Sequence, residues 1–319
     1  MDSFELQKLA ERTRSMREAG IAIILASGLL ALLLFIPSEK RDQNVNLNFG
    51  DQITSVSISP DAFAKVHIVA DAAIVYDLAT EETLYEKNSE AQLPLASLTK
   101  LITVYAALTE LSPNTPIDIP EEATRLDGSH IFSAGQTFAL DDLARLTLTA
   151  SLNDGAAAIA SATANRKNIP QSNIMAAAAA ALNLTQTYAV NGSGLDVTKS
   201  VSGGYGSARD LAILAGALIT LAPAIADATT HDSARAVSTS GKHFSVINTD
   251  PLVNTIPRLL LSKTGYTDLA GGNLALVFDA GIGHPIAVVI LGSSQNARFT
   301  DSTALVYATL AHYAGVASL

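Results

Sequence analysis

The order of apolar and polar positions divides this chain into strand-like segments near both ends and helix-like segments between them. Apolar runs that are typical of strands cover residues 67–78, 82–86, 259–261, 274–278 and 286–291. Apolar residues recur at helical spacing in residues 97–108, 141–150, 155–164, 175–184, 208–221 and 301–313. Strands at both ends with helices between them predict an α+β fold, in which one sheet is built from both ends of the chain and a helical lobe is inserted.

The first 65 residues follow a different pattern. Residues 20–36 contain no charged side chain, and this length is at the short end of what can span a bilayer. Basic residues precede this run at Lys8, Arg12, Arg14 and Arg17. The positive-inside rule then predicts a cytoplasmic segment (1–19), a transmembrane signal anchor (20–36), a linker (37–65) and a folded domain (66–319) outside the membrane, in the periplasm or at the cell surface. A cleaved signal peptide is the alternative, although no small-residue cleavage site follows Ile36 directly.

Composition excludes several classes of function. The net charge of −10 gives no basic surface for nucleic acid, and cysteine is absent, which excludes disulfides and thiolate chemistry. The six histidines show no spacing typical of metal ligands, so we expect neither a metal nor a cofactor. A hydrophobic content of 48% against 16% charged residues predicts a well-buried core rather than disorder.

A candidate nucleophile lies at the start of the apolar run 97–108. Ser97 and Lys100 are three positions apart, so on a helix they share one face, with the hydroxyl beside the amine. A lysine beside a serine at a helix N-terminus is one way to activate a nucleophile. The alternative is an ordinary first turn with a serine cap and a lysine that reaches to solvent.

Two further stretches contain residues suited to chemistry. Ser151 and Asn153 interrupt the helical pattern, where short polar side chains favour a turn; a plain junction between two helices is the alternative. The sequence Lys263-Thr264-Gly265 follows the apolar residues 259–261, and its glycine would let another backbone approach closely. A strand that ends in an exposed lysine and a turn is the alternative there. Three prolines between residues 111 and 120 predict a loop.

The order S-x-x-K, S-x-N, K-T-G is the set found in penicillin-binding proteins and class A β-lactamases. From about residue 66 to the end, the chain resembles a D-alanyl-D-alanine carboxypeptidase of the low-molecular-mass penicillin-binding protein type. Residues 82–88, 191–196, 208–211 and 263–271 resemble further landmarks of that family. The resemblance implies a β-lactamase/transpeptidase-like fold, with an antiparallel sheet flanked by helices. Leu152 departs from the family, which usually has a small residue there, and predicts an altered rim of the cleft.

The resemblance also implies the roles of the residues that handle protons. Ser97 would attack the carbonyl between two terminal D-alanines and form an acyl-enzyme. Lys100 would take the hydroxyl proton in its neutral form, because burial and the nearby charge of Lys263 lower its pKa. Ser151 would relay a proton to the leaving nitrogen, and Asn153 would hydrogen-bond the substrate backbone and steady Lys100.

A second group of residues would hold the substrate. Lys263 and Thr264 would bind its terminal carboxylate, and the resemblance suggests Arg298 as a further contact. For Arg298, a surface arginine at the start of the last helix is the alternative. The backbone N–H groups of Ser97 and Tyr266 would form the oxyanion hole, next to Gly265.

The expected function is therefore serine-type D-Ala-D-Ala carboxypeptidase action on peptidoglycan stem peptides, with β-lactams as covalent inhibitors at Ser97. An endopeptidase that cuts peptidoglycan cross-links would use the same acyl-enzyme and stays open. A class A β-lactamase needs a glutamate between the second and third motifs, and this chain has none after Glu122. A non-catalytic peptidoglycan-binding scaffold would need none of these residues together. The family's frequent C-terminal domain is not expected, and the N-terminal segment would supply the anchor.

Overall fold

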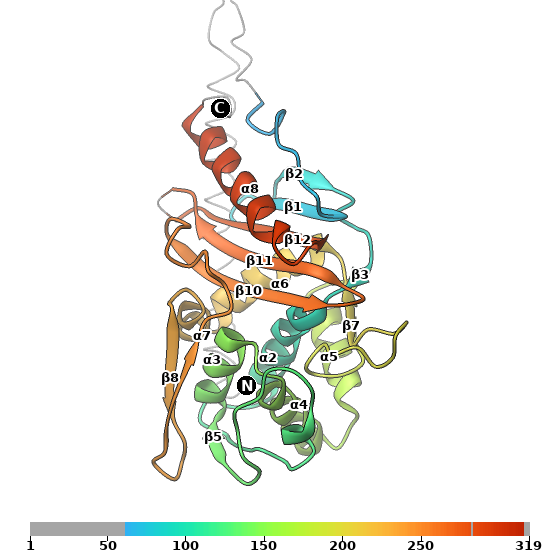
Figure 1. The fold of residues 1–319 in the computed structure, drawn as a ribbon, viewed down its shortest axis with the longest axis vertical. Coiled ribbons are helices and arrows are strands. Elements are labelled where there is room, and N and C mark those ends of the chain that lie inside the picture. Colours follow the sequence, from blue (N-terminus) through green and yellow to red (C-terminus); the bar gives the residue numbers. More distant parts are fainter. Residues whose placement is uncertain (1–60, 282, 316–319) are drawn as a thin grey trace, which may run out of the picture. The chain divides into compact units, whose positions relative to one another are not determined.

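A five-stranded antiparallel sheet lies at the centre of the part of the chain that the computed structural model describes, residues 61–281 and 283–315 (Figure 1). Its strand order is β10-β11-β12-β1-β2. The strands are β1 (Ala72–Asp77), β2 (Thr83–Lys87), β10 (Leu259–Thr267), β11 (Gly271–Asp279) and β12 (Pro285–Ser293). β1 pairs with β12 from Ala72 opposite Leu291 to Asp77 opposite Ile286. The predicted sheet from distant parts of the chain is confirmed.

β1 is buried along its whole length because both faces of the sheet are covered. Ala72, Ile74 and Tyr76 pack into the larger core cluster, which includes the helical lobe. Ala73 and Val75 point to the opposite face and pack into a second cluster with the last helix, α8 (Ala297–Ala314). Figure 1 shows α8 lying across that face of the sheet. A strand covered on both faces is apolar throughout, which explains the continuous run in the sequence.

The helical lobe lies between β3 and β10 in the sequence and below the sheet in Figure 1. Its helices are α2 (Thr99–Glu110), α3 (Leu140–Ala150), α4 (Asn153–Lys167), α5 (Gln171–Ala181), α6 (Ala208–Leu221) and the short α7 (Pro223–Ala228), with 3-10 turns η1 (Ala96–Leu98) and η2 (Ala123–Arg125). α2 packs against α4, α5 and α6, and α6 also packs on the sheet. α2 is therefore held inside the lobe with its first turn next to the sheet.

Several element boundaries differ from those predicted. The expected loop 111–120 contains the short strand β4 (Pro116–Asp118), which pairs with β5 (Thr137–Ala139). The helix predicted at residues 175–184 begins earlier, at Gln171, directly after a proline that fits a helix N-terminus. The predicted interruption at 151–154 is only two residues long, because α4 begins at Asn153.

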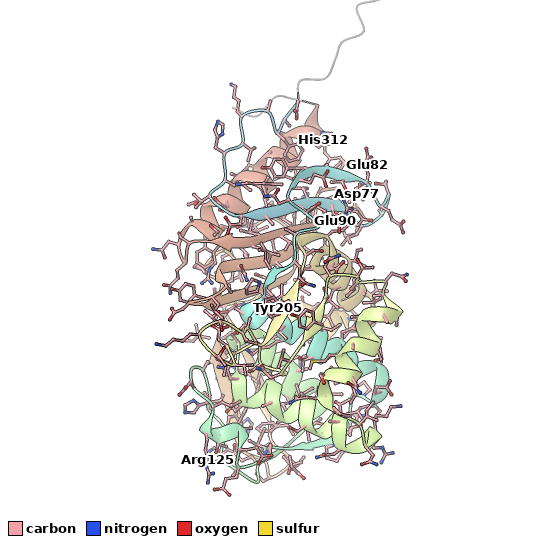
Figure 2. All side chains as sticks on the ribbon, turned by 90° about the vertical axis from the view of Figure 1, so that its right-hand side faces the viewer. Asp77, Glu82, Glu90, Arg125, Tyr205 and His312 are labelled. Carbon is pink, nitrogen blue, oxygen red and sulfur yellow. The ribbon has the colours of Figure 1, made fainter. Side chains whose placement is uncertain are left out.

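A β-hairpin was not predicted. β8 (Ser233–Val237) and β9 (His243–Ile247) alternate exposed and buried positions and pack against α3. The remaining short strands are β3 (Leu93–Pro94), β6 (Tyr188–Ala189) and β7 (Gly204–Gly206). Tyr205 of β7 pairs with Pro94 of β3 and lies between the sheet and the helical lobe (Figure 2). β3 and β7 thus fix the chain directly before Ser97.

The predicted transmembrane segment 20–36 and most of the predicted linker 37–65 lie outside the described residues. Residues 61–65 form a turn, and the first strand begins at Ala72 rather than near residue 66. Within residues 61–281 and 283–315, no helix has the length and apolar character needed to cross a membrane.

Candidate active site

Ser97 lies in the 3-10 turn η1, which joins β3 to α2. The Leu95 N–H donates to the Gly204 carbonyl at 2.9 Å, so the turn is fixed to β7. Ala96 has a φ of 48°, a left-handed conformation that is unfavourable for a residue with a Cβ. The chain at Gly194 passes so close to this turn that no side chain fits: a Cβ at that position would lie 1.9 Å from the Ala96 carbonyl oxygen. The backbone that presents Ser97 is held in an unusual conformation by its neighbours.

Lys100 is completely buried, and its amine contacts three neutral oxygen atoms. Its Nζ lies 2.7 Å from the Ser97 Oγ, the Asn153 Oδ1 and the Ser193 carbonyl oxygen. Burial, followed by the positive charge of Lys263, holds the pKa of Lys100 well below its ordinary value of 10.5, and Asp154 acts in the opposite direction. A neutral lysine amine within hydrogen-bond distance of a serine hydroxyl can accept its proton.

The second motif occupies the junction between α3 and α4. Ser151 ends α3 in the left-handed conformation, with a φ of 58°, and so turns the chain into the next helix. Asn153 is the first residue of α4; its backbone N–H donates to Ser129 and its side-chain amide to the Asp127 carbonyl, both at 2.7 Å. Its Oδ1 is therefore left free to face Lys100. The adjacent Asp154 accepts N–H groups from the loop that contains Ser129, at Ile131 and Phe132.

The expectation that Leu152 alters the rim of the cleft is wrong. Only 1% of this residue is exposed, and it packs in the larger core cluster. Residues on either side of it line the cleft because the left-handed turn at Ser151 points alternate side chains away from the core.

The third motif lies on β10, at the edge of the sheet. Lys263 is 1% exposed, and its Nζ donates to the Thr264 carbonyl at 2.7 Å. Burial, followed by the charge of Arg298, lowers the pKa of Lys263 from 10.5 to about 7, and Asp250 opposes this change. The alternative of an exposed lysine at a strand end is therefore wrong.

Arg298 is the second residue of α8 and reaches the same edge of the sheet. It is 8% exposed, and its Nη1 donates to the Gly265 carbonyl at 2.5 Å. The alternative of a surface arginine is thus excluded. The structure brings Arg298 next to the third motif, although the two are far apart in the sequence.

Gly265 lies directly against the nucleophile turn. A Cβ on Gly265 would be 3.0 Å from the Leu95 carbonyl oxygen and 3.2 Å from the Ser97 nitrogen, closer than ordinary packing allows. The Asn273 amide of β11 donates to the Pro94 carbonyl at 3.0 Å and adds a second link between sheet and turn. The glycine of K-T-G therefore allows β10 to approach the backbone of Ser97.

These elements enclose a cleft of about 290 Å³. It is lined by seven of the predicted site residues: Ser97, Ser151, Asn153, Thr264, Gly265, Tyr266 and Arg298. The two other predicted residues, Lys100 and Lys263, are buried behind its surface. The lining also includes Gly194, Leu195 and Thr267, from the segments 191–196 and 263–271 that resemble family landmarks. The sequence did not single out the remaining lining residues, Gly128, Ser129, Ala150 and Thr249. Thr249 belongs to a polar triplet before a proline, which predicts a turn but not a position in the cleft.

Comparison with known proteins identifies the family. The sequence pattern that describes D-alanyl-D-alanine carboxypeptidases matches residues 57–295. This chain belongs to that family. The resemblance predicted from the three motifs is confirmed, and the chain is a hydrolase of the serine D-alanyl-D-alanine carboxypeptidase kind.

Three similar proteins illustrate the range of the family. The D-alanyl-D-alanine carboxypeptidase DacF of Bacillus subtilis is 27% identical over 277 residues, which cover 82% of this chain and 69% of that protein. A D-alanyl-D-alanine endopeptidase of Pseudomonas aeruginosa is 30% identical over 262 residues, 79% of this chain and 82% of that protein. The crystal structure of penicillin-binding protein D2 from Listeria monocytogenes with bound ampicillin has a TM-score of 0.65 and 27% identity, and the match covers 76% of this chain and 98% of that one.

Proposed function

We propose that this enzyme removes the terminal D-alanine from peptidoglycan stem peptides through an acyl-enzyme on Ser97. The observation that carries this proposal is the contact of 2.7 Å between the Ser97 hydroxyl and the fully buried Lys100 amine. A lysine in that environment favours its neutral form, which is the form that can remove a proton from serine.

Acylation follows from this arrangement. Ser97 attacks the carbonyl carbon of the penultimate D-alanine while its proton moves to Lys100. The backbone N–H groups of Ser97 and Tyr266 stabilise the negative charge on the carbonyl oxygen. Ser151, which lines the cleft beside Asn153, passes a proton to the leaving nitrogen, and the terminal D-alanine departs. Water then hydrolyses the ester on Ser97, with Lys100 as the base.

The substrate's terminal carboxylate binds at the sheet side of the cleft. Thr264 and Arg298 line the cleft there and Lys263 is buried directly behind it, so this side supplies two cations and a hydroxyl. A carboxylate that accepts charge-assisted hydrogen bonds from such a site is held firmly and in one orientation. The same cations suit the carboxylate of a β-lactam, which we propose acylates Ser97; the ampicillin complex of the Listeria protein supports this proposal.

The experiment is a digestion of purified muropeptides followed by mass analysis. We expect pentapeptides to lose one alanine, and we expect Ser97→Ala to abolish both this loss and labelling by a fluorescent penicillin. Label that survives in Ser97→Ala would exclude this nucleophile, and rapid turnover of the bound penicillin would favour a β-lactamase instead.

Endopeptidase action on cross-links is the second candidate, and the Pseudomonas relative that is named an endopeptidase favours it. Both reactions break the bond after a D-alanine, so the cleft described above serves either. Cross-linked dimers in the same digestion decide between them. Their conversion to monomers would show endopeptidase action, whereas intact dimers beside shortened pentapeptides would support the carboxypeptidase.

We further propose that residues 20–36 anchor the enzyme in the cell membrane, with residues 1–19 in the cytoplasm and the catalytic domain outside. The uncharged run and the basic residues before it support this topology. Protease treatment of intact spheroplasts tests it. We expect the catalytic domain to be digested from outside, and a protected catalytic domain would contradict the orientation.

A further inference from the structure

The segment between β9 and β10 contributes two residues that belong to none of the three motifs: Thr249 contacts the third motif, and Asp250 contacts the residue directly before it. The Thr249 Oγ1 lies 2.6 Å from the Thr264 Oγ1, and the Asp250 Oδ2 accepts a hydrogen bond from the Ser262 hydroxyl at 2.5 Å. Ser262 and Thr264 are two positions apart on β10, so their side chains point to the same face of the strand. Asp250 and Thr249 therefore contact the residues that directly precede and follow Lys263 on β10.

Thr249 also connects the two walls of the cleft. Its backbone N–H donates to the Thr149 carbonyl at 3.2 Å, two residues before Ser151 at the end of α3. Its side chain is exposed and lines the cleft. The Thr249 hydroxyl is thus held at a defined place between the helical lobe and the sheet, within reach of a ligand in the cleft.

The hydrogen-bonding capacity of the two hydroxyls determines what Thr249 can do. A threonine hydroxyl has one proton to donate and can accept two, whereas a carboxylate only accepts. Thr264 can donate to a substrate carboxylate only if its proton is not used elsewhere. When Thr249 donates to Thr264, the Thr264 proton is free to point at the substrate.

Asp250 fixes β10 next to Thr264. It is 2% exposed, its Oδ2 accepts the Ser262 hydroxyl, and its Oδ1 accepts the Leu252 N–H at 2.8 Å. The segment that carries Thr249 is therefore held against the strand that carries Thr264.

We propose that Thr249 is a positioning residue for the carboxylate subsite: it directs the Thr264 hydroxyl proton toward the substrate's terminal carboxylate, while Asp250 holds the neighbouring part of β10 through the Ser262 hydroxyl. This inference rests on the proposed function, in which Lys263 and Thr264 bind that carboxylate. Thr249 takes no part in acyl transfer itself. It acts on how strongly the enzyme prefers a substrate that ends in a free carboxylate.

The experiment measures this preference with two matched substrates. One is an N-acyl-D-alanyl thioester of thioglycolate, whose leaving group carries a carboxylate, and the other is its neutral methyl ester. The ratio of their kcat/KM values reports the carboxylate contact alone, because the acyl group that reacts with Ser97 is the same. We expect Thr249→Val to lower this ratio about tenfold, in line with the loss of one hydrogen bond that serves a charged group.

Two variants control the measurement. Thr249→Ser keeps the hydroxyl and should restore the wild-type ratio. Thr255→Val makes the same chemical change at an exposed threonine of the same segment and should leave the ratio as it is. A wild-type ratio in Thr249→Val would overturn the role of Thr249. If the wild-type enzyme itself shows no preference for the acid, the proposed carboxylate site is wrong and the inference falls with it.

Discussion

Lys100 and Lys263 are two buried lysines beside one cleft, and the environment of each suits a different task. Lys100 contacts three neutral oxygen atoms, from Ser97, Asn153 and Ser193. The Lys263 amine donates instead to the Thr264 carbonyl. Each lysine has one cation that lowers its pKa and one carboxylate that raises it, namely Lys263 and Asp154 for Lys100, and Arg298 and Asp250 for Lys263. Burial lowers the pKa of both, but that of Lys263 only to about 7, whereas that of Lys100 lies well below its ordinary value.

The difference teaches that burial alone does not determine what a lysine does. A base must be neutral at the working pH, and an anion-binding group must be charged. In this cleft, the amine of Lys100 contacts the serine hydroxyl that it is to deprotonate, and the amine of Lys263 lies at the strand that is to bind the carboxylate. The helical lobe thus provides the proton acceptor and the sheet provides the anion site.

The largest effect is expected from Lys100→Met, which removes the base and keeps a similar apolar stem. Acylation of Ser97 by a fluorescent penicillin should slow by about 1000-fold, within the range for loss of a general base. Stopped-time labelling followed by gel fluorescence measures the rate. Lys167→Met, at an exposed lysine paired with Glu110, is the matched control and should label at the wild-type rate. Less than tenfold slowing in Lys100→Met would assign the base to another group.

Lys263→Gln should lower kcat/KM for carboxylate substrates by about 10- to 100-fold, as expected for loss of a charged hydrogen-bond donor. Because Lys263 is charged only below its pKa of about 7, wild-type kcat/KM should fall as pH rises through about 7. A bound carboxylate favours the charged form, so the corresponding fall in kcat should come at higher pH. Steady-state rates from pH 5 to 9 measure the fall of kcat/KM and the fall of kcat. If kcat/KM of Lys263→Gln still falls as pH rises through about 7, another group titrates there.

Gly265→Ala tests the close contact between β10, which carries Lys263, and the turn that carries Ser97 directly before Lys100. Its Cβ would press on the Leu95 carbonyl and the Ser97 nitrogen, at 3.0 and 3.2 Å, and displace the nucleophile turn by a few tenths of an ångström. We expect a roughly tenfold slower acylation, since small displacements of reacting groups reduce rates strongly. Gly281→Ala, where a Cβ meets open space, is the control for the labelling assay. An unchanged acylation rate would mean that β10 can move away from the turn without disturbing Ser97.

Leu152→Ala should have the smallest effect on catalysis and a clear effect on stability. Leu152 is buried in the core, so truncation should lower the free energy of unfolding by about 2–5 kcal/mol. The acylation rate per folded molecule should stay within about threefold of the wild type. Urea denaturation and active-site titration with labelled penicillin separate the two quantities. A change in KM with unchanged stability would return Leu152 to the rim of the cleft.

Much of the site could be predicted from sequence because its motifs are local. The Ser97–Lys100 pair follows from helical spacing, and the left-handed turn at Ser151 follows from short polar residues that interrupt a helix. The sheet followed from apolar runs at both ends, which needed no knowledge of side-chain contacts.

The parts that were missed depend on contacts between distant residues. The Ser193 carbonyl that binds Lys100 is a backbone atom, and its residue type carries no signal of that role. Leu152 was expected to alter the rim because the family usually has a small residue there, and only the fold shows that the turn points its side chain inward. The hairpin of β8 and β9 does alternate apolar and polar residues, but its strands are short and polar enough to resemble a loop.

The pairing of β1 with β12 has a consequence for when the enzyme becomes active. Ser97 follows closely after β1, but β12 and Arg298 are synthesised only near the end of the chain, with Ala72 opposite Leu291 in the finished sheet. Contacts between such distant residues form late in folding. A growing chain therefore carries its nucleophile before the strand and helix that complete the cleft. Ser97 acquires its substrate-binding side only once β10 and α8 have been synthesised and the sheet has formed.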